Sequence, residues 1–370
     1  MEAARIFNFS AGPSMLPLEV LKQAQAEFIS YKGTGMNVME MSHRSKEFVD
    51  IWNNCRNRIK TMLKVPDNYK IFLLQGGGML EFAAIPLNIL GDNTKANYLI
   101  TGEWSKKAAQ DAAKFCQVVP VWKDFKGTEY TTVPDKTTWN VDKTAAYFYY
   151  TSNETIHGVE MADFPYEMAE GMPIVCDMSS NFMSRPVDVA KYGIIYAGAQ
   201  KNLGPAGTTV VIIRDDLIGK KCKAHPCPTM IDFEAINKDG EAMLNTPASY
   251  TNYMCGLVLD YMFKMGGVEF YDKLSNDKSK IIYDIIDGSN GYYLNKINHN
   301  YRSRMNLVFR IKDDPKLEDK FVAEAKKQGM TELKGHRSVG GMRASLYNGM
   351  PMEGVVKLAD FMKKFMAENK

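Results

Sequence analysis

The sequence predicts an α/β protein in which helices cover a mostly parallel sheet. Short apolar runs alternate with helical patterns through the first two thirds of the chain, and this alternation is typical of parallel strands joined by crossover helices. Small or polar residues follow several of the runs, at the sheet edge where such proteins bind ligands. A chain of 370 residues can bury a large core and form two domains.

We expect strands over residues 69–74, 96–101, 118–121, 145–150, 173–176, 193–196, 208–213 and 305–311. We expect helices over 17–30, 46–63, 78–90, 250–265, 268–286 and 316–328, another opening at 103, and one at the C-terminus. Residues 214–249 and 335–348 have no clear period. The resulting division is an N-terminal arm (1–16), a large domain (17–266) and a small α+β domain (267–370).

Composition excludes several classes of protein. Basic residues number 46 and acidic residues 43, for a net charge of +3, which is not the footprint of a nucleic-acid or acidic-membrane binder. No apolar run reaches the length of a membrane span. The first residues lack the apolar segment of a secretory signal, so we expect a cytoplasmic protein.

The six cysteines are scattered and predict reduced core or loop residues. Cys222, His225 and Cys227 lie close together in the sequence, but no second ligand cluster completes a zinc motif. Prolines at 226 and 228 favour a loop there. We therefore expect no metal.

Lys201 lies in a segment of small residues, 197–207, between two strand-like runs. Glycines let a backbone approach a bulky, flat group. A lysine that is partly desolvated there has a lowered pKa and can form a Schiff base. The segment is equally consistent with a surface lysine in a glycine-rich hairpin.

Three other features fit a phosphorylated, aromatic cofactor. Residues 76–78 are glycines between a strand and a helix, which suits a phosphate on backbone N–H groups or a plain tight turn. Trp104, at the start of the next helix, can stack on a ring or only pack. Asp177 ends a buried strand, where it needs a cationic partner or caps the following turn.

Together these residues predict pyridoxal phosphate (PLP). Its aldehyde requires a lysine, its pyridine nitrogen a carboxylate, its phosphate backbone donors and its ring a flat neighbour. Two further basic groups suit anions: His43 with Arg44 at a helix entry, and His336, Arg337 and Arg343 among glycines.

The sequence resembles the phosphoserine aminotransferases, in the class V group of fold-type I PLP enzymes, essentially from end to end. The stretches that carry the resemblance are 8–13, 41–44, 75–78, 153–158, 196–202 and 335–345. It implies a large domain with a mixed, mostly parallel sheet of seven strands, and a smaller C-terminal domain.

The resemblance also implies roles for individual residues. Lys201 would bind the cofactor covalently and move the proton, Asp177 would pair with the ring nitrogen, and Trp104 would stack on the ring. The remaining cofactor contacts would come from Thr155, Gly78, Met79 and Gln200, and from Asn245 and Thr246 of a second subunit. Some members have arginine at the position of Met79, so this cradle has one charge fewer.

The implied reaction is a two-stage amino transfer in serine biosynthesis, within a homodimer whose sites lie at the subunit interface. L-glutamate leaves as 2-oxoglutarate, and 3-phosphohydroxypyruvate becomes O-phospho-L-serine. Arg343 would bind the substrate α-carboxylate. His336 and Arg337, with His43 and Arg44 of the other subunit, would bind the substrate phosphate. A side activity on the 4-phosphohydroxythreonine couple is compatible with the same groups.

Other functions remain open at this point. One is a class V relative with another substrate, such as a small-amino-acid transaminase or a cysteine desulfurase, for which Cys222 and Cys227 are the loop candidates. Another is a non-catalytic protein that binds a phosphorylated ligand on the same scaffold. The intact Lys201 and Asp177 argue against the latter.

Overall fold

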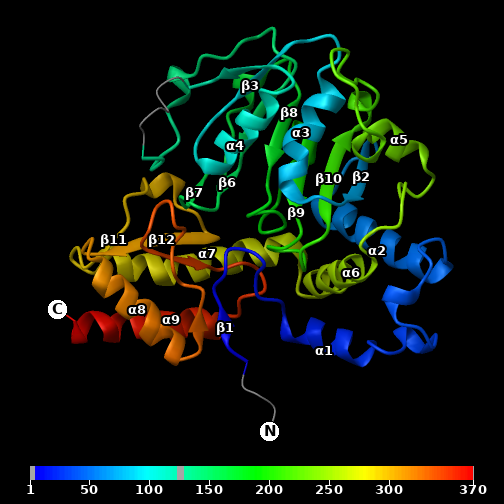
Figure 1. The fold of residues 1–370 in the computed structure, drawn as a ribbon. Helices are drawn as coiled ribbons and strands as arrows, with labels where there is room; N and C mark the ends of the chain where they lie inside the picture. The colour runs from blue at the N-terminus through cyan, green and yellow to red at the C-terminus, as the bar shows by residue number, and fades with distance from the viewer. Residues whose placement is uncertain (1–4, 123–128, 370) are drawn as a thin grey trace.

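The computed structural model describes residues 5–122 and 129–369, and in that part of the chain a seven-stranded sheet forms the centre of the fold (Figure 1). Its strand order is β2-β10-β9-β8-β5-β3-β4. Strand β10 runs antiparallel to β2 and β9, and the other pairings are parallel. The predicted α/β class with a mostly parallel, mixed sheet is confirmed. The seven strands are β2 (Tyr69–Leu74), β3 (Lys95–Tyr98), β4 (Gln117–Pro120), β5 (Phe148–Thr151), β8 (Ile174–Asp177), β9 (Ile194–Gly198) and β10 (Thr209–Arg214).

Helices cover both faces of this sheet because its strands are apolar on both sides. Side chains alternate along each strand, so that Phe72 joins the core on one face while Ile71 and Leu73 join the core on the other. The first face packs against α3 (Gly77–Ile89), α4 (Glu103–Ala112) and α5 (Phe233–Lys238), and the second against α2 (Lys46–Leu63), α6 (Ser249–Lys264) and the first turns of α7 (Gly267–Asp287).

Local signals set several helix boundaries. Helix α2 begins where predicted because the Ser45 hydroxyl accepts a hydrogen bond from the Phe48 amide at 3.3 Å. It ends at Lys64, which has a left-handed backbone conformation. Helix α1 (Leu18–Ala26) stops short of the predicted end at residue 30, and a short 3₁₀ turn at Tyr31–Gly33 follows.

The C-terminal part builds a second, three-stranded antiparallel sheet from β11 (Tyr293–Leu294), β12 (Asn306–Ile311) and β14 (Met342–Ser345). Helices α8 (Pro315–Lys327) and α9 (Met352–Glu368) pack on it together with the end of α7. The N-terminal strand β1 (Phe7–Asn8) pairs in parallel with β13 (Met330–Thr331), so the arm lies against this part of the chain (Figure 1).

Two segments without a clear period contain regular structure, contrary to expectation. Residues 214–249 include α5, and residues 335–348 include β14. Strand β14 forms because it pairs with β12, with Leu307 opposite Ala344; such a long-range partner leaves no mark in the local sequence.

Short elements complete the described fold. Strands β6 (Asn153–Glu154) and β7 (Val159–Glu160) form a small hairpin beyond the end of β5. Further 3₁₀ turns lie at Val38–Glu40, Lys136–Thr138, Tyr166–Ala169, Val189–Lys191, Asp215–Leu217, Thr229–Ile231 and His299–Tyr301.

Helix α7 belongs to both parts of the molecule. Val268 and Tyr271 near its start join the core of the large sheet, whereas Ile282 and Ile286 near its end join the core of the C-terminal sheet. The division between 266 and 267 therefore stays a prediction.

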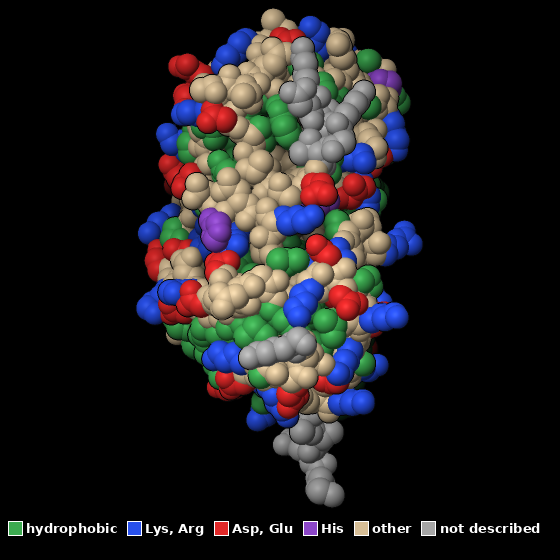
Figure 2. All heavy atoms as spheres, turned by 90° about the vertical axis from the view of Figure 1, so that its left-hand side faces the viewer, with side chains coloured by type: hydrophobic (Ala, Val, Ile, Leu, Met, Phe, Trp, Pro, Cys, Tyr) green, Lys and Arg blue, Asp and Glu red, His purple; other side chains and the backbone are tan. Residues whose placement is uncertain are grey.

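Charges of both signs are mixed on the face of the molecule that Figure 2 draws. Within residues 5–122 and 129–369, no helix combines the length and the apolar character that crossing a membrane requires.

Candidate active site

A cavity of about 280 Å³ lies between the two parts of the chain and collects residues from distant segments. Its walls come from the starts of α3 and α4, the β6–β7 hairpin, the segments after β8 and β9, and β14. Nine of the predicted site residues line it: Gly78, Met79, Trp104, Thr155, Asp177, Gln200, Lys201, His336 and Arg343. The walls bring carboxylate, amine, guanidinium and indole groups to one place.

Lys201 follows β9, and its amine makes one hydrogen bond in the described part of the chain. Lys201 Nζ donates to Thr155 Oγ1 at 2.9 Å, and it lies 5.9 Å from the centre of the Trp104 ring. Burial lowers the pKa of Lys201 to about 8, with Asp177 opposing this effect and Arg343 adding to it. About one tenth of the amine is therefore unprotonated and nucleophilic at pH 7, far more than for an ordinary lysine.

Asp177 ends β8 and is almost fully buried, with 5% of its surface exposed. Its Oδ1 accepts a hydrogen bond from the Ser179 amide at 2.8 Å, so it does cap the following turn while also lining the cavity. Burial raises the pKa of Asp177, and Lys201 and Ser179 act in the opposite direction. A buried carboxylate of this kind favours a cationic group in the cavity.

The first turn of α3 supplies the phosphate-cradle candidate. Gly76 has φ +105° and precedes the helix. Gly78 and Met79 line the cavity and lie in the first turn of α3, where backbone N–H groups have no carbonyl partner within the helix. A side chain at Gly78 would place a Cβ 3.2 Å from Ser179 Oγ. Met79 is 55% exposed and adds no charge, so an anion there depends on backbone donors.

Arg343, on β14, reaches across from the C-terminal sheet. Its Nη1 donates to the Thr155 carbonyl at 3.3 Å, which leaves donors of the guanidinium for a carboxylate. His336 also lines the cavity, and burial together with nearby Arg343 lowers the pKa of its ring.

Five predicted residues do not line this cavity in the single chain. Arg337 is exposed on the loop before β14. The other four gather elsewhere: His43 Nδ1 lies 3.1 Å from Thr246 Oγ1, and Arg44 Nη1 lies 3.3 Å from Asp239 Oδ1. Asn245 lines a different hollow, beside Gly76.

Two residues of the N-terminal arm were not among the predicted site residues: Gly12, which lines the cavity, and Ser14, which binds the backbone of the Lys201 segment. Gly12, in the N-terminal arm, has φ +127°, and a Cβ there would lie 3.2 Å from Lys201 Cγ. Ser14 donates from its hydroxyl to the Lys201 carbonyl and from its amide to the Gln200 carbonyl, the latter at 2.9 Å. The Gly-Pro pair at 12–13 is a local turn signal, but the contact partner of this segment leaves no local signal, because the contact spans almost 190 positions.

The loop cysteines stand apart from the cavity. Burial raises the pKa of the Cys227 thiol to about 11, which disfavours a reactive thiolate. Among residues 5–122 and 129–369, no three His, Cys, Asp or Glu side chains are grouped as metal ligands.

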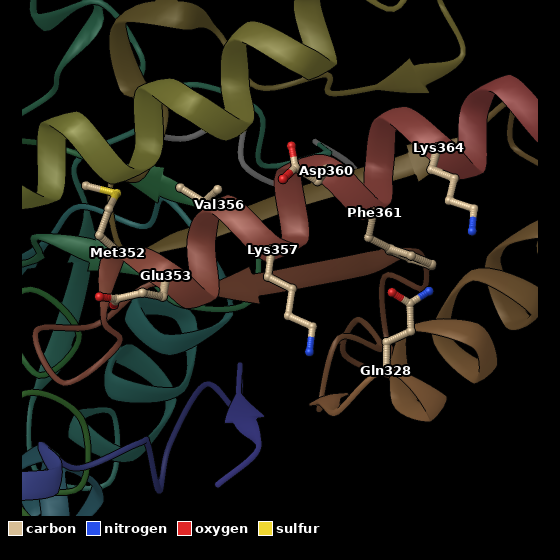
Figure 3. Close-up of a pocket in the computed structure, with 8 residues that line it drawn as sticks. All are labelled: Gln328, Met352, Glu353, Val356, Lys357, Asp360, Phe361 and Lys364. Atoms are coloured by element: carbon tan, nitrogen blue, oxygen red, sulfur yellow. The ribbon is translucent and has the colours of Figure 1, made fainter. Parts of the chain in front are cut away.

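A second hollow, of about 530 Å³, runs along α9 (Figure 3). Its lining is made of α9 side chains such as Lys357 and Phe361, with Gln328 from the end of α8. None of the predicted site residues lies there, so the candidate active site is the cavity around Lys201.

The chain is similar in sequence to known aminotransferases over almost its whole length. The model of the family described as aminotransferase class-V matches residues 6–358. A phosphoserine aminotransferase of Drosophila melanogaster is 50% identical, covering 99% of this chain and 100% of its own, and that of Chromobacterium violaceum is 46% identical over 98% of both.

Solved structures of phosphoserine aminotransferases have the same fold as this chain. The phosphoserine aminotransferase of Bacillus circulans subsp. alkalophilus superimposes with a TM-score of 0.94 at 41% identity, covering 100% of both chains. The PLP-bound phosphoserine aminotransferase of Trichomonas vaginalis gives a TM-score of 0.92 at 40% identity, covering 97% of this chain and 100% of the other.

Proposed function

Because this chain belongs to the class-V aminotransferase family, we propose that it is a PLP-dependent phosphoserine aminotransferase. It transfers the amino group between L-glutamate and 3-phosphohydroxypyruvate, in L-serine biosynthesis. The observation that carries the proposal is that a lysine amine, a buried carboxylate and a guanidinium from three separate strands or strand ends line one cavity.

The residues fit pyridoxal phosphate. Asp177 offers a buried carboxylate for the ring nitrogen, Trp104 a face for the ring, and the start of α3 the donors for a phosphate. Lys201 would hold the aldehyde carbon. When bound, the cofactor supplies an electron sink that stabilises negative charge at the substrate Cα.

Lys201 is the group that moves the proton. Its amine lies in a partly desolvated site with one hydrogen bond, to Thr155, and its lowered pKa lets it accept and return a proton near neutral pH. Because the same amine is freed in both half-reactions, a single base serves both.

Arg343 and the loop that follows β13 orient the substrate. Arg343 would bind the α-carboxylate in a bidentate manner. His336 and Arg337 come from the segment just before β14, so one short stretch of chain would hold both anionic ends of a phosphorylated substrate. A plain alanine or glyoxylate transaminase would need Arg343 but not this additional basic pair.

The proposal includes a homodimer that completes each site. The four residues expected from a second subunit cluster with one another, as the His43–Thr246 contact illustrates, and away from Lys201 in the same chain. Large apolar side chains are exposed in the N-terminal region, including Ile29 at 79% and Met39 at 55%, which supports an interface there.

The direct test is an assay of the purified protein with L-glutamate and 3-phosphohydroxypyruvate. We expect equimolar 2-oxoglutarate and O-phosphoserine, and much slower turnover when pyruvate or glyoxylate replaces the phosphorylated acceptor. Equal rates with all acceptors would assign the chain to a relative with another substrate, and no transfer at all with added PLP would overturn the aminotransferase proposal.

Substrate selection is tested by Arg337→Ala. We expect the KM for 3-phosphohydroxypyruvate to rise about 10- to 100-fold, the usual cost of a lost charge-assisted contact, while the half-reaction with glutamate changes little. Lys334→Ala is a matched control, because Lys334 is an exposed cation paired with Asp319 at 3.1 Å. Equal impairment of both half-reactions would argue against a phosphate-binding role.

A further inference from the structure

Glu154 is a fully buried carboxylate, with 0% of its surface exposed, that has no assigned role in the reaction. It lies on β6, yet its side chain binds the first turn of α4. Glu154 Oε2 accepts from the Trp104 amide at 2.9 Å, and Oε1 accepts from the Ser105 amide at 2.9 Å and the Ser105 hydroxyl at 2.6 Å. The carboxylate thus acts as the N-terminal cap of a helix that is distant in the sequence.

The backbone at the start of α4 leaves room for this carboxylate. A Cβ at Gly102 would lie 2.3 Å from Glu154 Cδ, so only glycine is compatible with the carboxylate in its present place. The φ of Gly102 is −178°, which any residue can adopt. The requirement for glycine therefore comes from the approach of Glu154 and not from the conformation of the chain.

Both ends of this contact belong to the cavity wall. Trp104 is the second residue of α4, and its indole Nε1 is buried without a hydrogen-bond partner in the described part of the chain, so no hydrogen bond of the ring itself sets its position. Thr155, the neighbour of Glu154, accepts from Lys201 through its hydroxyl and from Arg343 through its carbonyl. One carboxylate therefore joins the segment that presents the indole to the segment that contacts the lysine and the arginine.

We propose that Glu154 is a positioning residue that fixes Trp104 and Thr155 relative to each other, and so holds the indole face that stacks on the cofactor ring in place relative to the groups that Lys201 and Arg343 contact. The inference rests on the proposed function, since it assigns Glu154 to the same PLP site. Glu154 does not react: its two carboxyl oxygens accept hydrogen bonds from the Trp104 and Ser105 amides, which holds the start of α4 and the indole that it carries in place.

The test compares the affinity for PLP of the Glu154→Gln variant with that of the wild-type protein. The amide keeps the shape but replaces one acceptor with an N–H group that faces the α4 donors. We expect the dissociation constant of PLP, titrated into the apoenzyme and followed by absorbance, to rise about 10- to 100-fold. Excess PLP should restore kcat to within a few-fold, because Lys201 and Asp177 are intact.

The matched control is Glu160→Gln. Glu160 is buried on the facing strand of the same hairpin, but it pairs with Arg304 at 3.1 Å and is not bonded to α4. We expect this variant to unfold at a lower temperature while its PLP dissociation constant stays within about threefold of the wild type. If both variants weaken PLP binding equally, the hairpin matters only as a fold element and the inference is wrong.

A milder variant, Ser105→Ala, keeps the test decisive if Glu154→Gln does not fold. It removes the 2.6 Å bond to Glu154, together with the hydrogen bonds that Ser105 Oγ accepts from the Thr101 and Gly102 amides at 2.9 and 3.1 Å. Both amide contacts of Glu154 remain, so we expect a rise of about three- to tenfold in the PLP dissociation constant. An unchanged constant overturns the inference. A wild-type protein that fails to bind PLP overturns the proposed function instead, and the two failures are thus separated.

Discussion

Two lysines with lowered pKa values lie in different regions of the molecule and have opposite surroundings. Lys201, in the cavity, donates one hydrogen bond, to Thr155 at 2.9 Å. Lys278, on α7, is 1% exposed and donates to the carbonyls of Leu346, Tyr347 and Met350 at 2.9, 2.8 and 3.1 Å. Burial lowers the pKa of Lys201 to about 8 and that of Lys278 to about 7.

The difference shows that burial alone does not make a lysine reactive. Three carbonyl acceptors match the three N–H donors of an ammonium group, and a neutral amine could fill only two of them. The geometry around Lys278 therefore favours the charged form, and all three of its N–H donors are already used. Lys201 keeps unused donors and faces a cavity, which is the arrangement that a nucleophile or base requires.

The largest expected effect comes from Lys201→Ala. Loss of the amine removes the base, and we expect transamination to fall by about 10⁴-fold while the thermal unfolding temperature changes little, because the site is half-buried. The measurement is turnover with glutamate and 3-phosphohydroxypyruvate alongside an unfolding scan. Retained turnover would assign the chemistry to another residue.

Lys278→Met should act on stability instead. It leaves three buried carbonyls without a donor, and we expect the free energy of unfolding in urea to fall by about 3 kcal/mol, with kcat nearly unchanged at a temperature where the variant is folded. The control is Lys280→Met: that lysine is exposed and pairs with Asp284 one turn away at 2.6 Å, so about 0.5 kcal/mol is expected. Similar losses in the two variants would contradict the carbonyl-cage interpretation.

The smallest expected effect is the pH dependence of the rate at which Lys201 reacts with PLP. Protonated lysine is not a nucleophile, and the pKa of Lys201 is about 8, so PLP capture by the apoenzyme should accelerate about tenfold between pH 7 and pH 9 and then level off. Stopped-flow absorbance measures this rate. A profile that keeps rising to pH 10.5 would mean that the environment of Lys201 does not lower its pKa.

Much of the fold and part of the site could be predicted because their signals are local. The Ser45 cap and the period of residues 46–63 lie within one helix, and α2 matches the prediction. The small residues around Lys201, the glycines before α3 and the acid at the end of β8 are each adjacent to the strand that positions them. Strand β14 and the Glu154 contact could not be predicted, because their partners lie about 35 and 50 positions away.

The fold class, the chemical identity of the lysine and the acid, and the family resemblance follow from residue type and spacing along the chain. Which lysine keeps unused hydrogen-bond donors depends on its neighbours in the folded chain. In the sequence, Lys278 is one of several cations on an amphipathic helix, and its three carbonyl partners come from a loop about 70 positions further on. Burial and hydrogen-bond supply are properties of neighbours in space, and the packing of α7 against the C-terminal sheet establishes them.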